Sequence, residues 1–222
     1  MRMRKKKHLD ERLEACRGVD LGWIPDGVHE NGLAGPVDVS AVFGNTAPLR
    51  LEIGCGKGKF ANTIAGREPD INFIAVEQTV NVIVSAMEQT RDLGLSNLRY
   101  LCGKAEYLLK VIPPKSVERI YLNFSCPFPK NSYAKHRLTH ERFLAIYREI
   151  LTDDGYIIQK TDNAGFFEFS LNSYSDNGFR LRNITFDLHN SGITGNIITE
   201  YEQRFLSQGL PIYYTEALPG KL

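Results

Sequence analysis

Two acidic residues flank a glycine cluster, and their spacing is typical of a nucleoside-binding site. Gly54, Gly56 and Gly58 follow Glu52 at every second position, so the backbone can turn sharply and a ligand can approach it without meeting a Cβ atom. Glu77 follows roughly 20 residues later, where a carboxylate can accept hydrogen bonds from both hydroxyls of a ribose. Glu52 favours a ligand that also carries a positive group.

The glycine cluster departs from the two common nucleotide-binding patterns. It is not G-x-G-x-x-G, and Lys59-Phe60 stands where a phosphate-binding loop needs a hydroxyl to hold magnesium. The acid, the glycine loop and the second acid together favour S-adenosylmethionine over a dinucleotide. A simpler alternative stays open, in which the glycines only form a tight turn and Glu77 caps the next helix.

Basic residues are concentrated in two segments of an otherwise balanced chain. Lys and Arg number 27 against 26 Asp and Glu, a net charge of +1, which argues against a protein covered all over by nucleic acid. Both segments suit phosphate groups, although a solvated face explains either of them from charge alone. They comprise Arg2, Arg4, Lys5, Lys6, Lys7 and Arg12, and then Lys130, Lys135, His136, Arg137, His140 and Arg142.

Alternating strands and helices must position these residues. Apolar runs predict strands, and apolar residues at helical spacing predict the segments between them. Because helical connections of ten or more residues join the strands, we expect a doubly wound α/β domain with a mostly parallel sheet, as in a Rossmann-like fold. The predicted strands span 49–53, 71–76, 98–102, 119–124 and 156–159, with another from 179, and the predicted helices span 60–65, 80–87, 105–111, 143–150 and 167–174.

Ligands of such sheets bind beyond the carboxyl ends of the strands. The candidate site therefore lies in the segments that follow the strands, which are Gly54–Gly58, Glu77, Lys104, Asn123–Lys130 and Lys160–Asn163. Thr139 is expected to cap the helix over 143–150, and the sequence Asp-Asp-Gly at 153–155 is expected to end it.

The composition shifts at about residue 48. Residues 1–48 contain turn dipeptides and little periodicity, which predicts a largely irregular basic arm with one short helix, and residues 49–222 form the α/β domain. No apolar run approaches the roughly 20 residues that cross a bilayer, and the first residues do not read as a secretory signal. The 4 cysteines are far apart, which indicates neither a zinc site nor a disulfide framework and favours a reducing cytoplasm.

The most distinctive motifs are the strand Tyr121–Phe124, the loop Pro127–Lys130 and the block Thr199-Glu200-Tyr201-Glu202. With the blocks at 1–4, 42–45, 52–58, 70–73, 160–163 and 187–190, they resemble the bacterial tRNA (guanine-N7)-methyltransferase family over nearly the whole chain. The resemblance implies a class I methyltransferase fold, S-adenosylmethionine as the methyl donor, and a guanine in the tRNA variable loop as the target.

The resemblance also implies roles for single residues. Glu52 and Glu77 match cofactor-binding acids of the family, while Lys130 and Asp162 match substrate-binding positions. The full candidate set comprises, for the cofactor, Glu52, Gly54, Gly56, Gly58, Glu77, Lys104 and Asn123; for the substrate, Lys130, Asp162, Thr199, Glu200, Tyr201 and Glu202; and for catalysis, Cys126 and Asp162.

Two positions depart from the family pattern. Lys104 stands where an aspartate near the cofactor adenine is expected, and Cys126 stands in the loop where the catalytic aspartate is expected. Guanine N7 already presents a lone pair, so its alkylation needs alignment rather than a general base. A neutral thiol is a weaker acceptor than a carboxylate, but Asp162 can still orient the base, which keeps an active enzyme plausible.

The sequence leaves three functional alternatives. The first is an active tRNA (guanine-N7)-methyltransferase, and the second is a weakened paralogue that binds cofactor and tRNA, because of Lys104 and Cys126. The third, a small-molecule methyltransferase, is disfavoured by the two basic segments.

Thr199 and Glu202 also fit a helix-capping box. His136 and His140 lack a third metal ligand, so we expect no metal. We also expect no membrane partner, and a monomer or homodimer.

Overall fold

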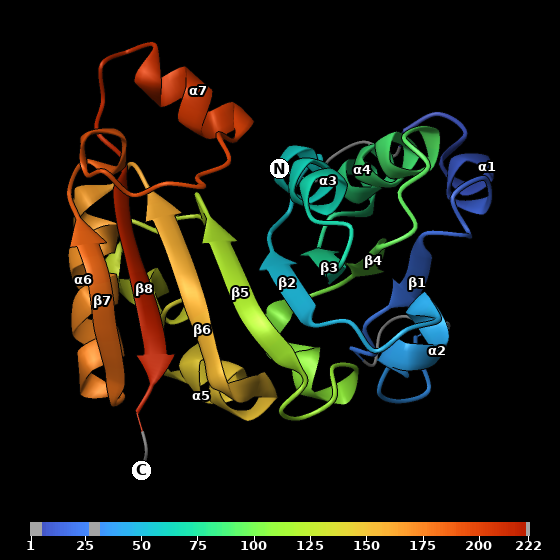
Figure 1. Ribbon diagram of the computed structural model, residues 1–222, viewed down its shortest axis with the longest axis horizontal. Coiled ribbons are helices and arrows are strands. Elements are labelled where there is room, and N and C mark those ends of the chain that lie inside the picture. The colour runs from blue at the N-terminus through green and yellow to red at the C-terminus, as the bar shows by residue number, and fades with distance from the viewer. Residues whose placement is uncertain (1–5, 27–31, 221–222) are drawn as a thin grey trace. The chain divides into compact units, whose positions relative to one another are not determined.

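The computed structural model describes residues 6–26 and 32–220 (Figure 1). The family block at residues 1–4, residue 5 and residues 27–31 of the predicted basic arm lie outside these ranges. The chain divides into two compact units, Met1–Pro113 and Pro114–Leu222. Each unit combines strands with helices, which confirms the predicted α/β class.

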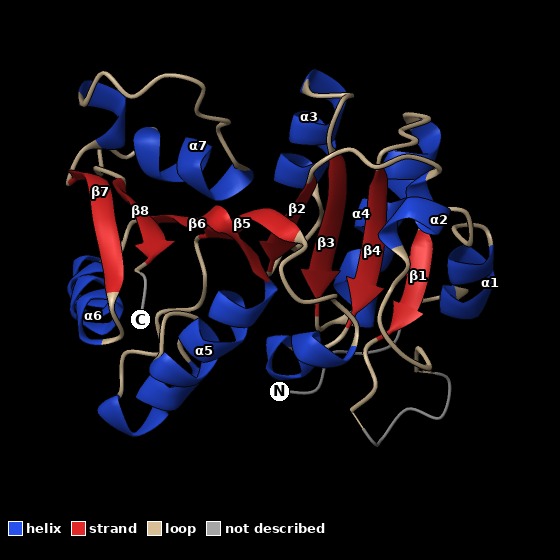
Figure 2. Ribbon diagram, turned by 60° about the horizontal axis from the view of Figure 1, so that its bottom comes forward, coloured by secondary structure: helices blue, strands red, loops and turns tan. Residues whose placement is uncertain are grey.

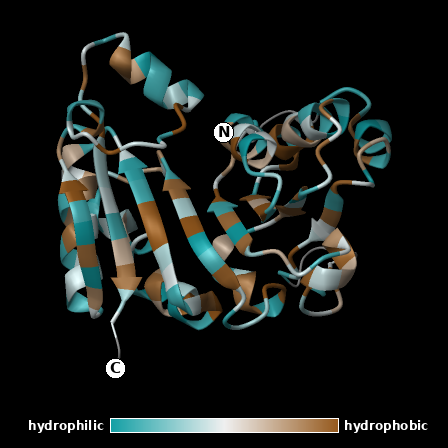
Figure 3. Cartoon of the chain, viewed as in Figure 1, coloured by the Kyte–Doolittle hydropathy of each residue, from teal (hydrophilic) through white to brown (hydrophobic). Residues whose placement is uncertain are grey.

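The first unit carries four parallel strands in the order β1-β4-β3-β2 among its described residues (Figure 2). Figure 3 shows apolar residues along β3 and β4, and Phe73, Ile74 and Leu101 are fully buried, as strands of a parallel sheet covered on both faces should be. The elements are α1 Leu9–Glu14, β1 Asp20–Trp23, α2 Val39–Phe43, β2 Leu49–Ile53, α3 Lys59–Arg67, β3 Asn72–Glu77, α4 Val80–Asp92, β4 Leu98–Cys102 and the 3-10 helix η1 Ala105–Lys110.

The structure contains more regular secondary structure before residue 48 than the sequence predicts. Instead of one short helix it has α1, α2 and the edge strand β1, which pairs with β4. Tyr100 donates its backbone N–H to Val19, and Ile24 donates to Cys102. All four residues of β1 are half-buried, and its sequence Asp-Leu-Gly-Trp shows no alternation of apolar and polar residues. The strand is defined by its pairing with β4, which the local sequence does not reveal.

The second unit has the strand order β5-β6-β8-β7. β5 and β6 are parallel, whereas β8 is antiparallel to both β6 and β7, and β8 is absent from the strands predicted above. The elements are β5 Val117–Asn123, η2 Asn131–His136, α5 Glu141–Ile150, β6 Leu151–Thr161, α6 Ala164–Asp176, β7 Phe179–Thr185, η3 Leu188–Asn190, α7 Glu200–Leu206 and β8 Tyr213–Pro219.

The predicted helix over 143–150 is present as α5 and ends at Ile150, but both predicted end signals are wrong. His140, not Thr139, caps the helix, and its side chain accepts from the N–H of Arg142 at 3.4 Å. Thr139 is fully buried, and its hydroxyl is 2.8 Å from that of Ser170 on α6. The Thr139 hydroxyl is therefore used in a tertiary contact with α6 and does not cap α5. At its other end the helix runs directly into β6 at Leu151, and residues 153–155 lie within that strand.

Candidate active site

The glycine loop connects β2 to α3 and is fastened to the end of β3. The backbone N–H groups of Gly54 and Cys55 donate to the carbonyl of Val76 at 2.8 and 3.0 Å. Gly54 and Gly56 have φ angles of 84° and 57°, a left-handed conformation that side chains disfavour. A Cβ atom at either position would meet no atom within 4 Å, so space beside the loop is open to a ligand.

Packing requires glycine at position 58. A Cβ atom there would lie 2.6 Å from the Cβ of Ala86 and 2.9 Å from the hydroxyl of Tyr100. Asn62 donates to the carbonyl of Gly58 at 2.9 Å, and the hydroxyl of Thr90 lies 2.6 Å from Asn62 Oδ1 and 2.8 Å from the Tyr100 hydroxyl. This buried network fixes the start of α3, and none of its side chains is among the residues predicted from the sequence.

The two predicted cofactor acids differ in exposure. Glu52 lies on β2 and is only 2% exposed, whereas Glu77 is half-buried at the end of β3. The Glu77 carboxylate accepts from the N–H of Thr79 at 2.9 Å and from that of Gly56 at 3.3 Å. Glu77 therefore joins the glycine loop to Thr79, the residue before α4, and this contact does not exclude a ligand. Lys104 follows β4 and is exposed.

The cysteines near the glycine loop are inert thiols. Burial, with Glu52 and Glu77 nearby, raises the pKa of the Cys55 thiol well above its ordinary value. Burial also raises the pKa of Cys102 to about 12. Because the thiolate is the nucleophile, neither residue can attack a substrate at neutral pH. All four cysteines are free of disulfides, and only Cys126 is exposed.

In the second unit, the loop after β5 is shaped by a buried arginine. Arg137 is 8% exposed, and its guanidinium donates to the carbonyls of Pro127 and Phe128, each at 3.0 Å. The same guanidinium lies 4.4 Å from the centre of the Phe169 ring. The charge pattern of the sequence placed Arg137 only among the phosphate-facing basic residues. The structure shows instead that Arg137 holds the Pro-rich loop.

The loop and Asp162 leave the same edge of the β5–β6 pair. Asn123, at the end of β5 and 9% exposed, is the register partner of Lys160 in the parallel strand β6. The N–H of Phe124 donates to the carbonyl of Lys160 at 2.8 Å. Cys126 and Lys130 are exposed and Asp162 is partly exposed, so these three predicted residues remain available to a substrate.

The block at 199–202 divides into buried and exposed residues. The predicted capping box is confirmed: the hydroxyl of Thr199 accepts from the N–H of Glu202 at 3.0 Å, and the carboxylate of Glu202 accepts from the N–H of Thr199 at 3.3 Å. Thr199 and Glu202 are buried at 6% and 0% exposure. Glu200 and Tyr201 are exposed, so the structure separates the four predicted substrate residues into two pairs.

No group of three or more His, Cys, Asp and Glu side chains that could hold a metal occurs in residues 6–26 and 32–220. His136 instead lies beside aromatic rings, with its centre 5.7 Å from that of Phe128 and 6.2 Å from that of Tyr133. The described part of the chain also contains no helix long and apolar enough to span a bilayer.

Solved structures with a similar fold include methyltransferases, among them S-adenosylmethionine-dependent ones. One from Aquifex aeolicus matches 81% of this chain and 88% of its own with a TM-score of 0.55 at 14% identity. The 16S rRNA methyltransferase KamB matches 86% of this chain and 97% of its own with a TM-score of 0.60 at 15% identity. The fold is therefore that of the Rossmann-like methyltransferases, as predicted.

Sequence comparison defines the family. A family model described as "Putative methyltransferase" matches residues 46–215. The tRNA (guanine-N(7)-)-methyltransferase of Brevibacillus brevis is 49% identical over 79% of this chain and 82% of its own length. That of Clostridioides difficile is 42% identical over 98% of both chains. The chain belongs to the tRNA (guanine-N7)-methyltransferase family, which confirms the resemblance seen in its motifs.

Proposed function

We propose that this chain transfers the methyl group of S-adenosylmethionine to N7 of a guanine in the tRNA variable loop. The observation that carries this proposal is its identity of 42% over 98% of the chain to a tRNA (guanine-N(7)-)-methyltransferase. The same identity favours an active enzyme over a weakened paralogue or a small-molecule methyltransferase. A cytoplasmic location and a monomeric or homodimeric state complete the proposal.

The first unit fits S-adenosylmethionine. Gly54 and Gly56 leave the backbone open to a ligand, and the half-buried Glu77 presents a carboxylate beside them. A carboxylate at this place can accept from ribose hydroxyls, while Glu52 supplies negative charge at the base of the loop. The other residues proposed for the cofactor are Gly58, Lys104, which follows β4, and Asn123, which is the last residue of β5 in the second unit.

The second unit supplies the groups that hold the base. Bound S-adenosylmethionine supplies an electrophilic methyl group, and guanine N7 needs no proton removed before it reacts. The contribution of this chain is therefore alignment. Asp162 can accept hydrogen bonds from the guanine edge, and Cys126 adds at most a weak acceptor. Lys130 is placed to contact a phosphate.

One assay tests this function directly. Purified protein is incubated with labelled S-adenosylmethionine and tRNA that lacks guanine-N7 methylation, and the labelled nucleotide is then mapped. We expect label on N7 of a variable-loop guanine. Label on another atom, or on no RNA at all, would contradict the proposed reaction.

Replacing Glu77 should weaken cofactor binding. Loss of hydrogen bonds to a charged acceptor typically costs about 1.5–3 kcal/mol, so we expect Glu77→Ala to raise the Kd of S-adenosylmethionine at least tenfold, as measured by calorimetry. Glu77→Gln retains an acceptor for the N–H of Gly56 and should have a smaller effect. An unchanged Kd in the alanine variant would remove Glu77 from the site.

Truncating the N-terminus should weaken tRNA binding without affecting the protein fold. Two basic residues of the predicted arm are engaged within the first unit, since Lys6 donates to Ser85 at 2.7 Å and Arg12 binds Glu88 through two contacts of 2.6 Å. Deleting residues 1–5 spares both contacts and removes Arg2, Arg4 and Lys5. These residues lie outside the described structure.

We expect this deletion to raise the Kd for tRNA and to flatten its dependence on salt. Each phosphate that the shortened arm no longer neutralises should reduce the slope of log K against log salt by roughly 0.7–0.9, because fewer counterions are released. Filter binding at several salt concentrations measures both quantities. A salt slope equal to that of the full chain would show that the arm does not touch the tRNA.

A further inference from the structure

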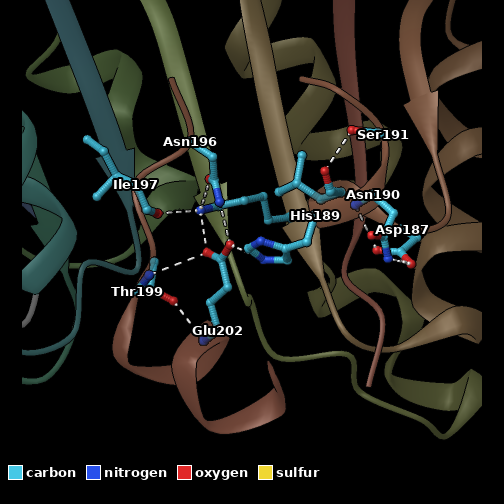
Figure 4. Close-up of polar contacts among 10 residues, drawn as sticks. Asp187, His189, Asn190, Ser191, Asn196, Ile197, Thr199 and Glu202 are labelled. Carbon is cyan, nitrogen blue, oxygen red and sulfur yellow. Dashed lines mark hydrogen bonds and ion pairs between the residues drawn. The ribbon is translucent and has the colours of Figure 1, made fainter. Parts of the chain in front are cut away.

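The Glu202 carboxylate is surrounded by donors from within the second unit (Figure 4). One oxygen accepts from Lys160 Nζ at 2.8 Å and from the N–H of Thr199 at 3.3 Å. The other accepts from the amide of Asn196 and lies 2.9 Å from Nε2 of His189. A carboxylate offers about four acceptor sites; three accept from Lys160, Thr199 and Asn196, the fourth faces His189, and the side chain is 0% exposed.

The ammonium group of Lys160 is also hydrogen-bonded within the protein. The side chain is 3% exposed, and its ammonium group donates to the carboxylate of Glu202, to Asn196 Oδ1 at 3.0 Å and to the carbonyl of Ile197 at 2.8 Å. An ammonium group has three protons to donate, and these three acceptors take all of them. The ion pair joins residues that are 42 positions apart and thereby fastens the segment 196–202 to the end of β6.

The pair lies between the segments assigned to the substrate. Through its backbone carbonyl, Lys160 also accepts from Phe124, where the Pro-rich loop begins. The Phe124 ring stacks on those of Tyr201 and Phe205 of α7, with centres 6.3 and 5.9 Å away. Figure 1 shows α7 beyond the carboxyl ends of β5 and β6. The position of one residue, Lys160, therefore affects the loop, α7 and the nearby Asp162.

We infer that Lys160 and Glu202 are positioning residues that do not contact tRNA. This inference rests on the proposed function. It replaces the direct substrate role that the family resemblance implies for Glu202 and Thr199. His189 and Asn196 belong to the same network, and the side chain of His189 is 27% exposed, more than those of Lys160 and Glu202.

A double-mutant cycle tests the inference. Lys160→Met and Glu202→Gln each leave one buried charge without its partner, which is strongly destabilising, whereas removing both charges is often nearly neutral. We expect each single variant to lower kcat/KM for tRNA at least tenfold, mainly through KM. The double variant should recover at least fivefold over Glu202→Gln, and the Kd of S-adenosylmethionine should stay within about threefold throughout.

Two results would overturn the inference. A double variant no better than Glu202→Gln would mean that the carboxylate itself binds the substrate, and a Lys160→Met variant with unchanged kcat/KM would mean that the pair positions nothing. Measuring the Kd for tRNA in parallel separates this inference from the proposed function. If the wild-type protein binds tRNA but does not methylate it, the proposed function fails while the cycle is still measured through binding.

Control variants keep the test independent of folding. Glu216→Gln removes another largely buried carboxylate of the second unit, which contacts Arg182 and Tyr214, and should lower Tm without changing KM for tRNA. If the Lys160 and Glu202 variants do not fold, the partly exposed His189 provides the test. We expect His189→Ala to raise KM for tRNA about threefold or more and His189→Gln, which keeps a donor, to restore it. An unchanged KM in His189→Ala would overturn the inference.

Discussion

Asp162→Ala is expected to lower the methylation rate about a hundredfold at saturating tRNA, because misaligned reactants commonly lose a factor of this size. Asp162 is partly exposed just after β6, next to the loop that carries Cys126. Since the thiol of Cys126 is a weak acceptor, we propose Asp162 as the main orienting group for the guanine. Single-turnover rates with bound tRNA measure the effect, and the Kd for tRNA should change little because phosphate contacts dominate it.

Cys126→Asp is the complementary substitution, and it should increase the methylation rate. A carboxylate in this exposed position would restore a charged acceptor toward the base, and we expect the rate to rise about tenfold, equivalent to about 1.4 kcal/mol of transition-state stabilisation. Cys126→Ser has similar size without the charge and should give no such gain. With the aspartate present, Asp162→Ala should cost less than in the wild type, because two groups that hold one base are coupled.

The two substitutions together locate the guanine. If Cys126→Asp were no faster and Asp162→Ala had no effect in either background, the guanine would not be held at the end of β5 and β6. Binding of S-adenosylmethionine and tRNA could then persist, but the alignment role assigned to these residues would be wrong.

Gly58→Ala is expected to disrupt the cofactor half of the site. Its Cβ atom would lie 2.6 Å from that of Ala86, at a φ of 79°. A left-handed non-glycine residue costs about 1–2 kcal/mol, and overpacking costs about 1–3 kcal/mol more. We expect the free energy of unfolding to fall by about 2–5 kcal/mol in total, measured by chemical denaturation.

The same substitution should raise the Kd of S-adenosylmethionine at least tenfold, because the start of α3 and the glycine loop must shift. Gly44→Ala is the matched control: its φ is 69° and its Cβ atom would meet nothing within 4 Å. In this control the free energy of unfolding should fall only by the cost of a left-handed non-glycine residue, because the new Cβ atom meets no neighbour. The affinity for S-adenosylmethionine should be unaffected. Equal losses of stability in the two variants would show that the contact with Ala86 is not what requires glycine at position 58.

Local patterns in the sequence were sufficient for the elements that carry the site. The apolar run at β3, the glycines after β2 and the helical spacing of α4 depend on neighbours in the chain, and they placed Gly54–Gly58 and Glu77 at the ends of adjacent strands. The capping box of Thr199 and Glu202 was predictable for the same reason, since its two hydrogen bonds close within one helical turn. The fold class and the family followed from these local blocks.

The tertiary structure decided which polar groups are used inside the protein. Arg137 and Lys160 are ordinary basic residues in the sequence, and only the folded chain buries them against Phe128 and Glu202. The strands β1 and β8 likewise depend on partners far along the chain. A hydrogen bond or ion pair between distant segments leaves no periodic signal in either one, because burial determines which donor meets which acceptor. For this reason the sequence could predict Glu202 for the site, whereas its burial among internal donors is visible only in the tertiary structure.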